Sequence, residues 1–349
     1  MDKSARGRFF EDFRRGETLR HGVPRTVGAG EVALYTALYG GRYAVHSADT
    51  VARAVGLPAA PLDDLLVFHL VFGKSVPDVS LNAVANLGYA AGHFLAPVYP
   101  GDTLSAASEV IGLRENSNRQ TGTVYVRTVG RRQDGEPVLD YVRWVMVRKR
   151  DPEAPALEPH VPGLPAAVDT ASLHVPAGLN GCGFDPVEGG APFLWDDYAV
   201  GERIDHVDGT TVTEAEHRLA TRLYHNTARV HFDDHAERGG RFGRTIVYGG
   251  HVISVARALA FNGLGAVVRI AAVNAGRHVA PCFAGDTIYA WSEVLDRAEL
   301  PGRTDLGALR LRLVATKDRP CADFPLRAGE VHDPSVLLDF DYWALLSRR

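Results

Sequence analysis

Apolar and polar positions follow the same order of elements twice along the chain. Apolar residues at helical spacing predict helices at about residues 31–39 and 62–73, and again at about 214–224 and 250–262. The third of these helices starts with the capping box Thr213-Glu214-Ala215-Glu216. The pattern therefore predicts two similar halves, each with a short helix followed by a more apolar one.

Three strand-like runs follow the second helix of each half, and several of them alternate between apolar and polar residues. The predicted strands cover residues 103–113, 122–130, 138–147, 287–295, 306–316 and 336–346. A helix followed by consecutive antiparallel strands is an α+β pattern, unlike the βαβ alternation of a nucleotide-binding sheet. We expect each sheet to wrap around its long helix.

The two halves also align residue by residue, with an offset near 185. Tyr39 aligns with Tyr224 and His46 with His231. Two longer anchors support the alignment: Phe10-Glu11-Asp12-Phe13-Arg14-Arg15-Gly16-Glu17 matches Trp195-Asp196-Asp197-Tyr198-Ala199-Val200-Gly201-Glu202, and Pro97-Val98-Tyr99-Pro100-Gly101-Asp102-Thr103-Leu104 matches Pro281-Cys282-Phe283-Ala284-Gly285-Asp286-Thr287-Ile288. A duplicated domain predicts a pseudo-dimer, with a first repeat at 1–150, a linker rich in proline and glycine at 151–192, and a second repeat at 193–349.

Composition narrows the class of protein. The chain has 349 residues, 46% of them hydrophobic and 23% charged, which fits two globular domains. Its net charge of −4 provides no basic surface for nucleic acid or an anionic membrane, and no run of 18 apolar residues occurs. The cysteines Cys182, Cys282 and Cys321 are too few and too scattered for a disulfide framework or a zinc site. We expect a cytoplasmic protein that binds neither nucleic acid nor membrane.

The candidate chemistry lies in the second half. His231 is the type of residue that gives and takes protons near neutral pH. Gly249 and Gly250 open a predicted helix, where free N–H groups can stabilise an oxyanion. Asn226 lies five residues before the histidine. These groups suit chemistry beside a carbonyl.

The first half lacks this arrangement. It carries Gly41 where the second half has Asn226, and Asp63 and Asp64 where the second half has Tyr248 and Gly249. The two aspartates are either a favourable charge at a helix start or an acid that reaches across the pseudo-dimer. Another motif, Gly73-Lys74-Ser75, looks like the end of a phosphate loop, but Phe68 stands where the first glycine of that loop is required.

The segment Tyr224-His225-Asn226-Thr227-Ala228-Arg229-Val230-His231-Phe232-Asp233, with Gly243-Arg244-Thr245-Ile246-Val247-Tyr248-Gly249 after it, resembles the motif of MaoC-like (R)-specific enoyl-CoA hydratases. That motif reads roughly Asp-x-Asn-Pro-x-His-x-Asp and then Gly-Arg-x-Ile-x-x-Gly. The resemblance implies a hotdog fold, and for a duplicated chain a double hotdog with its two sheets joined edge to edge.

Most of the chain outside the linker is also similar to the mesaconyl-CoA hydratase (2-methylfumaryl-CoA hydratase) family. The similarity is carried by Phe9-Phe10-Glu11-Asp12-Phe13, by Arg143-Trp144-Val145-Met146-Val147-Arg148-Lys149-Arg150-Asp151 and by Ala315-Thr316-Lys317-Asp318-Arg319-Pro320-Cys321. This resemblance implies a hydro-lyase that reversibly hydrates mesaconyl-CoA to β-methylmalyl-CoA in the ethylmalonyl-CoA or a related carbon-assimilation pathway. It also implies that neither a metal nor a redox cofactor takes part. We expect a homodimer.

One departure from the generic motif bears on mechanism. Asn226 stands where the motif has aspartate, and an amide cannot act as a base. Mesaconyl-CoA carries a free carboxylate on the carbon that receives water, so a carboxylate held nearby would be repelled. We expect either Arg229 or Arg277 to pair with the substrate carboxylate, and Tyr248 to contact the substrate.

Each of these residues has a structural alternative. Asn226 suits the end of a helix, the glycine pair suits close packing, and the two arginines suit an exposed surface. Three other functions also stay open. They are a broader (R)-enoyl-CoA hydratase, a hotdog thioesterase and a non-catalytic acyl-CoA-binding protein.

Overall fold

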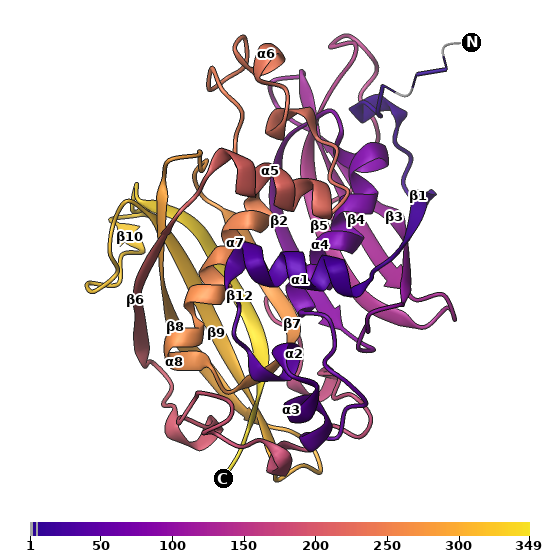
Figure 1. The fold of residues 1–349 in the computed structure, drawn as a ribbon. Coiled ribbons are helices and arrows are strands. Elements are labelled where there is room, and N and C mark those ends of the chain that lie inside the picture. The colour runs from indigo at the N-terminus through magenta and orange to yellow at the C-terminus, as the bar shows by residue number, and fades with distance from the viewer. Residues whose placement is uncertain (1–2, 5) are drawn as a thin grey trace.

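A single antiparallel sheet of ten strands organises the computed structural model, which describes residues 3–4 and 6–349 (Figure 1). The strand order is β1-β3-β4-β5-β2-β7-β12-β9-β8-β6, so the first five strands come from the first half of the chain and the last five from the second. The strands are β1 (Thr18–Thr26), β2 (Ala83–Phe94), β3 (Thr103–Glu115), β4 (Thr121–Arg131), β5 (Pro137–Arg148), β6 (Arg203–Thr211), β7 (Val267–His278), β8 (Thr287–Glu299), β9 (Leu306–Lys317) and β12 (Val336–Ser347). A separate two-stranded sheet pairs β10 (Arg327–Ala328) with β11 (Val331–His332).

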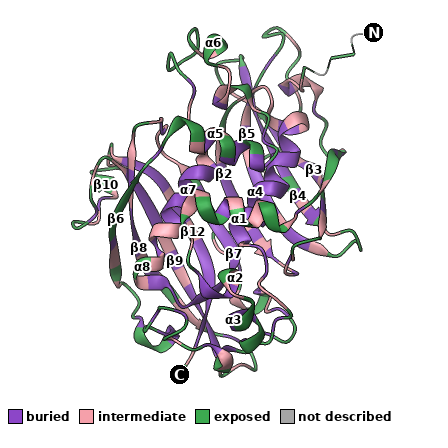
Figure 2. Ribbon diagram, viewed as in Figure 1, coloured by how far each residue is buried: buried purple, intermediate pink, exposed green. Residues whose placement is uncertain are grey.

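The helices gather on one face of the large sheet (Figure 1). Each half wraps one central helix, and every residue of the first central helix is buried, as Figure 2 shows. The helices are α1 (Ala29–Tyr39), α2 (Ala44–Ser47), α3 (Asp49–Ala54), α4 (Asp64–Ser75), α5 (Glu214–Leu223), α6 (Asp234–Glu237), α7 (Gly249–Leu259) and α8 (Phe261–Leu264). The expected α+β double hotdog is confirmed, with α4 and α7 as its two central helices.

Six strands and four helices agree closely with the sequence pattern, but four strands of the large sheet were missed. Two of these, β1 and β6, lie at the edges of the sheet and are interrupted by irregular register, between His21 and Arg25 in β1 and between Asp205 and Gly209 in β6. The other two, β2 and β7, are alanine-rich and lie at the centre of the sheet, so their sequences show little alternation.

The two halves meet where β2 pairs with β7, and this joins their sheets edge to edge as expected. Residues that the duplication aligns also contact each other across the junction. The Tyr39 and Tyr224 hydroxyl oxygens are 2.7 Å apart, and His69 Nε2 is 3.0 Å from Ser254 Oγ. Contacts between equivalent residues are what a pseudo-twofold axis produces.

Each half also keeps an equivalent internal hydrogen bond. His21 Nε2 lies 2.7 Å from Ser108 Oγ in the first half, and His206 Nε2 lies 2.8 Å from Ser292 Oγ in the second. The duplication therefore extends to individual polar contacts between the edge strand of each half and the strand next to it.

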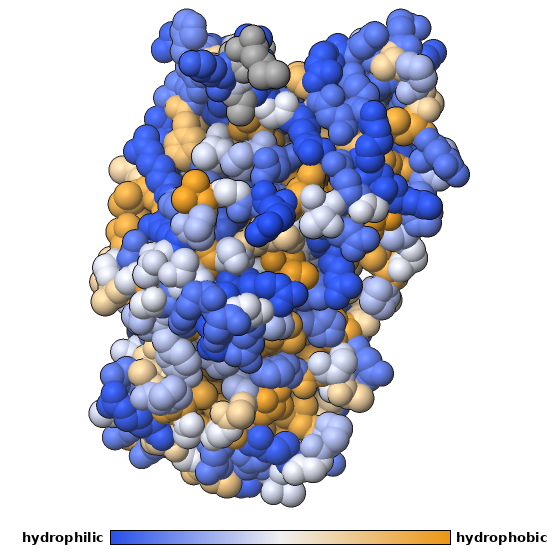
Figure 3. All heavy atoms as spheres, turned by 90° about the vertical axis from the view of Figure 1, so that its right-hand side faces the viewer, coloured by the Kyte–Doolittle hydropathy of each residue, from blue (hydrophilic) through white to orange (hydrophobic). Residues whose placement is uncertain are grey.

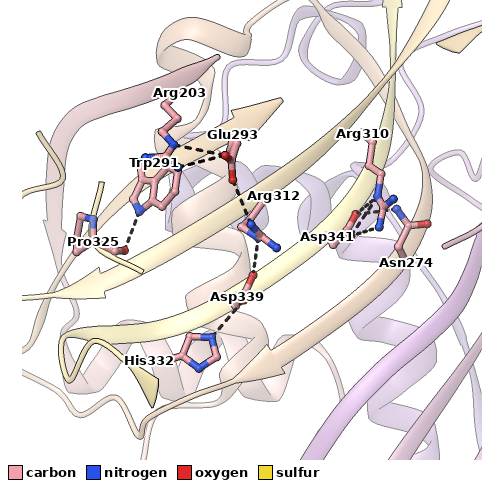
Figure 4. Close-up of polar contacts among 10 residues, drawn as sticks. All are labelled: Arg203, Asn274, Trp291, Glu293, Arg310, Arg312, Pro325, His332, Asp339 and Asp341. Carbon is pink, nitrogen blue, oxygen red and sulfur yellow. Dashed lines mark hydrogen bonds and ion pairs between the residues drawn. The ribbon is translucent and has the colours of Figure 1, made fainter. Parts of the chain in front are cut away.

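The face of the sheet opposite the helices carries charged side chains in the second half. Figure 4 shows Arg312 between Glu293, at 3.1 Å, and Asp339, at 3.3 Å. Farther along the same face, Arg310 pairs with Asp341 at 2.6 Å. These cross-strand pairs link β8, β9 and β12 on a surface that no helix covers.

The predicted linker lies against this sheet. The Val168 N–H donates to Asn274 Oδ1 at 2.8 Å, and Trp343 Nε1 donates to the Val168 carbonyl at 3.2 Å.

The surface on the side of the molecule that carries β1 and β3 has hydrophilic and hydrophobic residues interspersed (Figure 3). Within residues 3–4 and 6–349, no helix is long and apolar enough to span a bilayer.

Candidate active site

His231 is held as a neutral imidazole. It ends a short 3-10 turn (Arg229–His231) and is 7% exposed. Its Nδ1 lies 2.9 Å from the Ile246 carbonyl oxygen, which can only accept, so Nδ1 carries the proton. Burial lowers the pKa of His231 to about 4. The ring is thus fixed in the tautomer whose Nε2 can receive a proton.

Asn226 lies just beyond the end of α5, after Tyr224 and His225, and it is not the left-handed residue that ends this helix. That conformation belongs to His225, with φ of 57°, and the Asn226 N–H then returns to the Thr221 carbonyl at 3.1 Å. The Asn226 side chain is buried and its Oδ1 accepts from the Ala228 N–H at 3.0 Å. Since Oδ1 is engaged in this turn, Nδ2 is left as the group that can contact a ligand.

The start of α7 leaves two backbone donors without a hydrogen-bond partner among the described residues. Tyr248, the residue before the helix, provides no side-chain cap. No residue in the described part of the chain accepts a hydrogen bond from the N–H of Gly249 or Gly250. These two donors, with the positive end of the helix dipole, are available to an oxyanion.

Both glycines are also required by packing. A Cβ on Gly249 would lie 2.4 Å from the His278 ring, and one on Gly250 would lie 2.3 Å from the Tyr248 ring and 2.6 Å from His69. The glycine pair therefore serves close packing and also leaves free N–H donors at the helix start. The rings of His278, Tyr248 and His69, which leave no room for a side chain on the glycines, lie close to these N–H groups.

The Tyr248 ring lies at the centre of the site. Ring centroids of His231, His69, Phe72 and Tyr224 lie 5.6, 5.7, 5.7 and 6.0 Å from it. The Tyr248 hydroxyl is buried and has no hydrogen-bond partner among the described residues. Burial raises its pKa well above the ordinary value, so the hydroxyl keeps its proton and can donate.

The two arginines proposed as carboxylate ligands both have exposed side chains. Arg229 begins the turn that ends at His231, and Arg277 lies on β7 next to His278. Neither forms an ion pair with any described residue. Their positions place two free cations at the surface near the site rather than inside it.

The sequence analysis missed a chain of buried polar groups between the two halves. The Tyr39 hydroxyl lies 2.7 Å from the Tyr224 hydroxyl and 2.9 Å from His251 Nδ1, and Tyr35 lies 3.0 Å from Ser254 Oγ. The aligned tyrosines were the available signal, because equivalent residues near a twofold axis meet each other. These contacts fix α1, α5 and α7 against one another behind the site.

Asp63 and Asp64 have different roles. Asp63 caps α4, with Oδ1 accepting from the Leu65 N–H at 2.8 Å. Asp64 is buried and reaches across to β7, where its Oδ2 accepts from the Ile270 N–H at 2.7 Å. Both interpretations of this pair are therefore partly right, but Asp64 lies beside His46 of the first half, at 3.7 Å from Nε2.

A metal centre has no support in the side-chain geometry. Among residues 3–4 and 6–349, no three histidine, cysteine, aspartate or glutamate side chains come together in a way that could hold a metal ion.

Comparison with solved structures defines the class of protein. A MaoC domain protein dehydratase from Chloroflexus aurantiacus superposes with a TM-score of 0.98 at 61% identity, covering 100% of both chains. A conserved protein from Mycobacterium tuberculosis, described as a double hotdog, superposes with a TM-score of 0.75 at 25% identity, covering 98% of this chain and 99% of that one. The chain is thus a MaoC-like double hotdog protein.

Sequence comparison narrows the class to one family. The mesaconyl-CoA hydratase model matches residues 1–157 and the MaoC-like domain model matches residues 197–310. The β-methylmalyl-CoA dehydratase of Chloroflexus aurantiacus is 62% identical over 99% of both chains, and the mesaconyl-CoA hydratase of Cereibacter sphaeroides is 60% identical over 99% of this chain and 100% of that one. The chain belongs to the mesaconyl-CoA hydratase family.

Proposed function

We propose that the protein is a hydro-lyase that reversibly hydrates mesaconyl-CoA to β-methylmalyl-CoA. The observation that carries the proposal is the pairing of a neutral buried His231 with the uncapped start of α7, in a chain about 60% identical to relatives named for this reaction and its reverse. An imidazole base and two free N–H donors are the two groups that addition of water to a conjugated thioester needs.

The reaction divides between these groups. The Gly249 and Gly250 N–H groups bind the thioester oxygen and stabilise the enolate that forms when water adds to the β-carbon. His231 Nε2 takes one proton from the water as the bond between the water oxygen and the β-carbon forms. His231 then gives this proton to the α-carbon of the enolate, so one water is added in total. In the reverse direction the same groups remove the α-proton and release water.

Asn226 positions the water in this proposal. Its Oδ1 is bonded to the Ala228 N–H, so Nδ2 donates to the water oxygen and leaves the water hydrogens free to face His231. An amide in this place adds no negative charge beside the carboxylate of the substrate.

The remaining contacts are assigned by exposure and charge. Arg229 and Arg277, exposed near the site, are placed to meet the phosphates of coenzyme A rather than the acyl group. The reaction moves only water and protons, so the proposal includes no metal and no redox cofactor. A cytoplasmic homodimer remains the expected form, which light scattering would test.

Incubation with mesaconyl-CoA, crotonyl-CoA and acetyl-CoA tests the proposal. Mesaconyl-CoA should lose the absorbance of its conjugated thioester without release of free thiol. Faster turnover of crotonyl-CoA would favour a broader hydratase, thiol release from acetyl-CoA would favour a thioesterase, and binding without turnover would favour a non-catalytic module.

A further inference from the structure

Arg143 is a buried cation without an acidic partner. It lies on β5 with 0% of its surface exposed, and none of the described aspartates or glutamates forms an ion pair with it. Its Nη2 donates to Ser75 Oγ at 2.8 Å and to Ser80 Oγ at 3.3 Å. Its Nε and Nη1 are buried and have no hydrogen-bond partner in the described part of the chain. An unpaired buried charge is costly, so its presence calls for a ligand.

Two sets of contacts connect Arg143 to the start of α7. On one side, Arg143 pairs with Tyr89 across β5 and β2, and the Tyr89 hydroxyl lies 3.2 Å from His278 Nε2, the ring that packs on Gly249. On the other side, the guanidinium lies 4.2 Å from the centre of the Phe72 ring, which in turn packs against Tyr248.

Tyr248 supplies a second donor in the same region. Its hydroxyl is buried and has no hydrogen-bond partner among the described residues, and its ring centroid lies 5.7 Å from that of Phe72, the ring that the Arg143 guanidinium contacts. Because Tyr248 directly precedes Gly249, a ligand group at its side chain lies near the thioester group that the glycine N–H groups would bind. The two unsatisfied donors thus lie on the acyl side of the proposed oxyanion site.

We propose that Arg143, together with the Tyr248 hydroxyl, binds the free carboxylate of the acyl group. This inference rests on the proposed function. The carboxylate is attached to the carbon that receives water, and neutralising it reduces its repulsion of the incoming oxygen. The guanidinium is covered by side chains in the structure, so the carboxylate reaches it when the Phe72 or Tyr248 ring turns aside.

Three other buried cations either have a hydrogen-bond or ion-pair partner or lie away from Tyr248. Lys74 Nζ donates to the Val23 carbonyl at 2.7 Å, and Arg269 pairs with Asp64 at 3.4 Å. Arg257 lacks an acidic partner as well, but it lies on α7 with its guanidinium 3.4 Å from the centre of the Tyr43 ring, away from Tyr248. Of these four buried cations, only the Arg143 guanidinium lies on the Phe72 ring, which packs against Tyr248.

The duplication provides a matched control. Arg257 aligns with Phe72 in the central helices, and Arg143 aligns with Tyr342, each the seventh residue of the last strand of its half. At these two positions each half therefore has one buried arginine and one buried aromatic residue, with the two residue types exchanged between helix and sheet. Replacing Arg257 removes an equivalent buried cation from the last turn of α7, at the end of the helix opposite the Gly249 and Gly250 N–H groups.

Two saturated thioesters test the inference by binding alone, without turnover. Methylsuccinyl-CoA keeps the free carboxylate, and 2-methylbutyryl-CoA has a methyl group in its place. Calorimetry on the wild-type chain should give a dissociation constant about 10- to 100-fold lower for methylsuccinyl-CoA, the range of a hydrogen-bonded charge pair. Arg143→Leu should remove this difference and leave the affinity for 2-methylbutyryl-CoA within about twofold. Arg257→Leu should keep the difference.

The outcomes separate this inference from the proposed function. If the wild-type chain shows no preference between the two thioesters, carboxylate recognition fails and the proposed substrate fails with it. If the preference is present and Arg143→Leu, folded by circular dichroism, keeps it, only the role of Arg143 is overturned. Should Arg143→Leu not fold, Arg143→Lys decides the matter: a reduced preference supports the role, and an unchanged one contradicts it, because lysine keeps the charge without the planar fork.

Discussion

The starts of the two central helices differ in what occupies their free N–H groups. At α7, Tyr248 provides no cap and the Gly249 and Gly250 N–H groups are open to a ligand. At α4, the Asp63 side chain caps the Leu65 N–H at 2.8 Å. One duplicated element thus leaves its first N–H groups without a side-chain cap in one half and satisfies its own backbone in the other.

The histidines of the two halves are held in the same way. His231 Nδ1 lies 2.9 Å from the Ile246 carbonyl, and His46 Nδ1 lies 3.3 Å from the Pro61 carbonyl. Pro61 and Ile246 are themselves equivalent, because the offset of 185 residues aligns them. The difference is at the other ring nitrogen. His46 Nε2 faces the Asp64 carboxylate at 3.7 Å, whereas no described residue bonds to His231 Nε2.

Asp64 therefore gives the histidine of the first half a charged neighbour that His231 lacks. Its carboxylate pairs with Arg269 at 3.4 Å and accepts from the Ile270 N–H at 2.7 Å. The pocket that remains is lined by His46, Asp64, Arg269 and apolar side chains. The comparison teaches that the backbone contact of the histidine persists in both halves, while the residue at the facing helix start decides whether its other ring nitrogen has a charged partner.

The largest expected effect comes from removing the two aligned histidines in turn. His231→Ala should lower kcat/KM for mesaconyl-CoA by about 100- to 10,000-fold, because it removes the proton carrier. His46→Ala should change it by less than about threefold. Equal losses in the two variants, at unchanged melting temperatures, would show that the second half does not hold the base.

A second test removes the carboxylate that faces His46 in the first half. Asp64→Ala should lower the free energy of unfolding by about 3–5 kcal/mol, because Arg269 loses its buried partner, and should leave kcat/KM nearly unchanged. Asp63→Ala is the matched control and should cost only about 1 kcal/mol, the usual loss for a helix cap. Urea unfolding measures both. A stable Asp64→Ala variant with lost activity would place Asp64 in the reaction.

The sequence predicted the repeated elements because their signals are local. Helical spacing, the capping box at Thr213 and the alternation in strands such as Thr121–Arg131 each depend on residues close together in the chain. The strands β2 and β7 were missed because their alanine-rich sequences show little alternation. Their identity is decided by a partner from the other half, almost two hundred residues away.

The candidate site was predictable only where the family motif reached. His231, Asn226 and the glycine pair lie in one segment, and the structure shows a suitable histidine tautomer and a free helix start there. Arg143 gave no signal, since an arginine in an alternating strand looks like an exposed residue. Its burial arises from tertiary packing against Phe72, which the sequence pattern does not show.

Asn226→Asp tests the charge argument for the departure from the generic motif. The new carboxylate should lower turnover of mesaconyl-CoA, whose own carboxylate it would repel, and affect uncharged crotonyl-CoA less. The ratio of kcat/KM for the two substrates should fall by about tenfold in the variant. If the ratio is unchanged or rises, repulsion is not the reason for asparagine, and its turn with Ala228 becomes the better explanation.

The pH dependence of kcat/KM should be the smallest effect, and it tests whether the buried histidine is the base. His231 must be neutral to accept a proton, and burial lowers its pKa to about 4, so the active form persists as the pH falls below 6.5. Between pH 7 and pH 5.5, kcat/KM for mesaconyl-CoA should change by less than about twofold, whereas an ordinary histidine would lose about tenfold. An acid limb near pH 6.5 would indicate that a less buried group is the base and would contradict the assignment to His231.

Stability has to be measured alongside, because the same burial makes the fold sensitive to acid. Burial also lowers the pKa of His69 and His251 to about 3 and of His206 and His278 to about 4. Below pH 6.5 the unfolded chain binds protons that the folded chain does not, so the free energy of unfolding falls as the pH drops from 6.5 towards 4. A fall of kcat/KM at acidic pH that coincides with loss of the circular dichroism signal reports this unfolding. A fall at a pH where the protein is still folded reports protonation of the base.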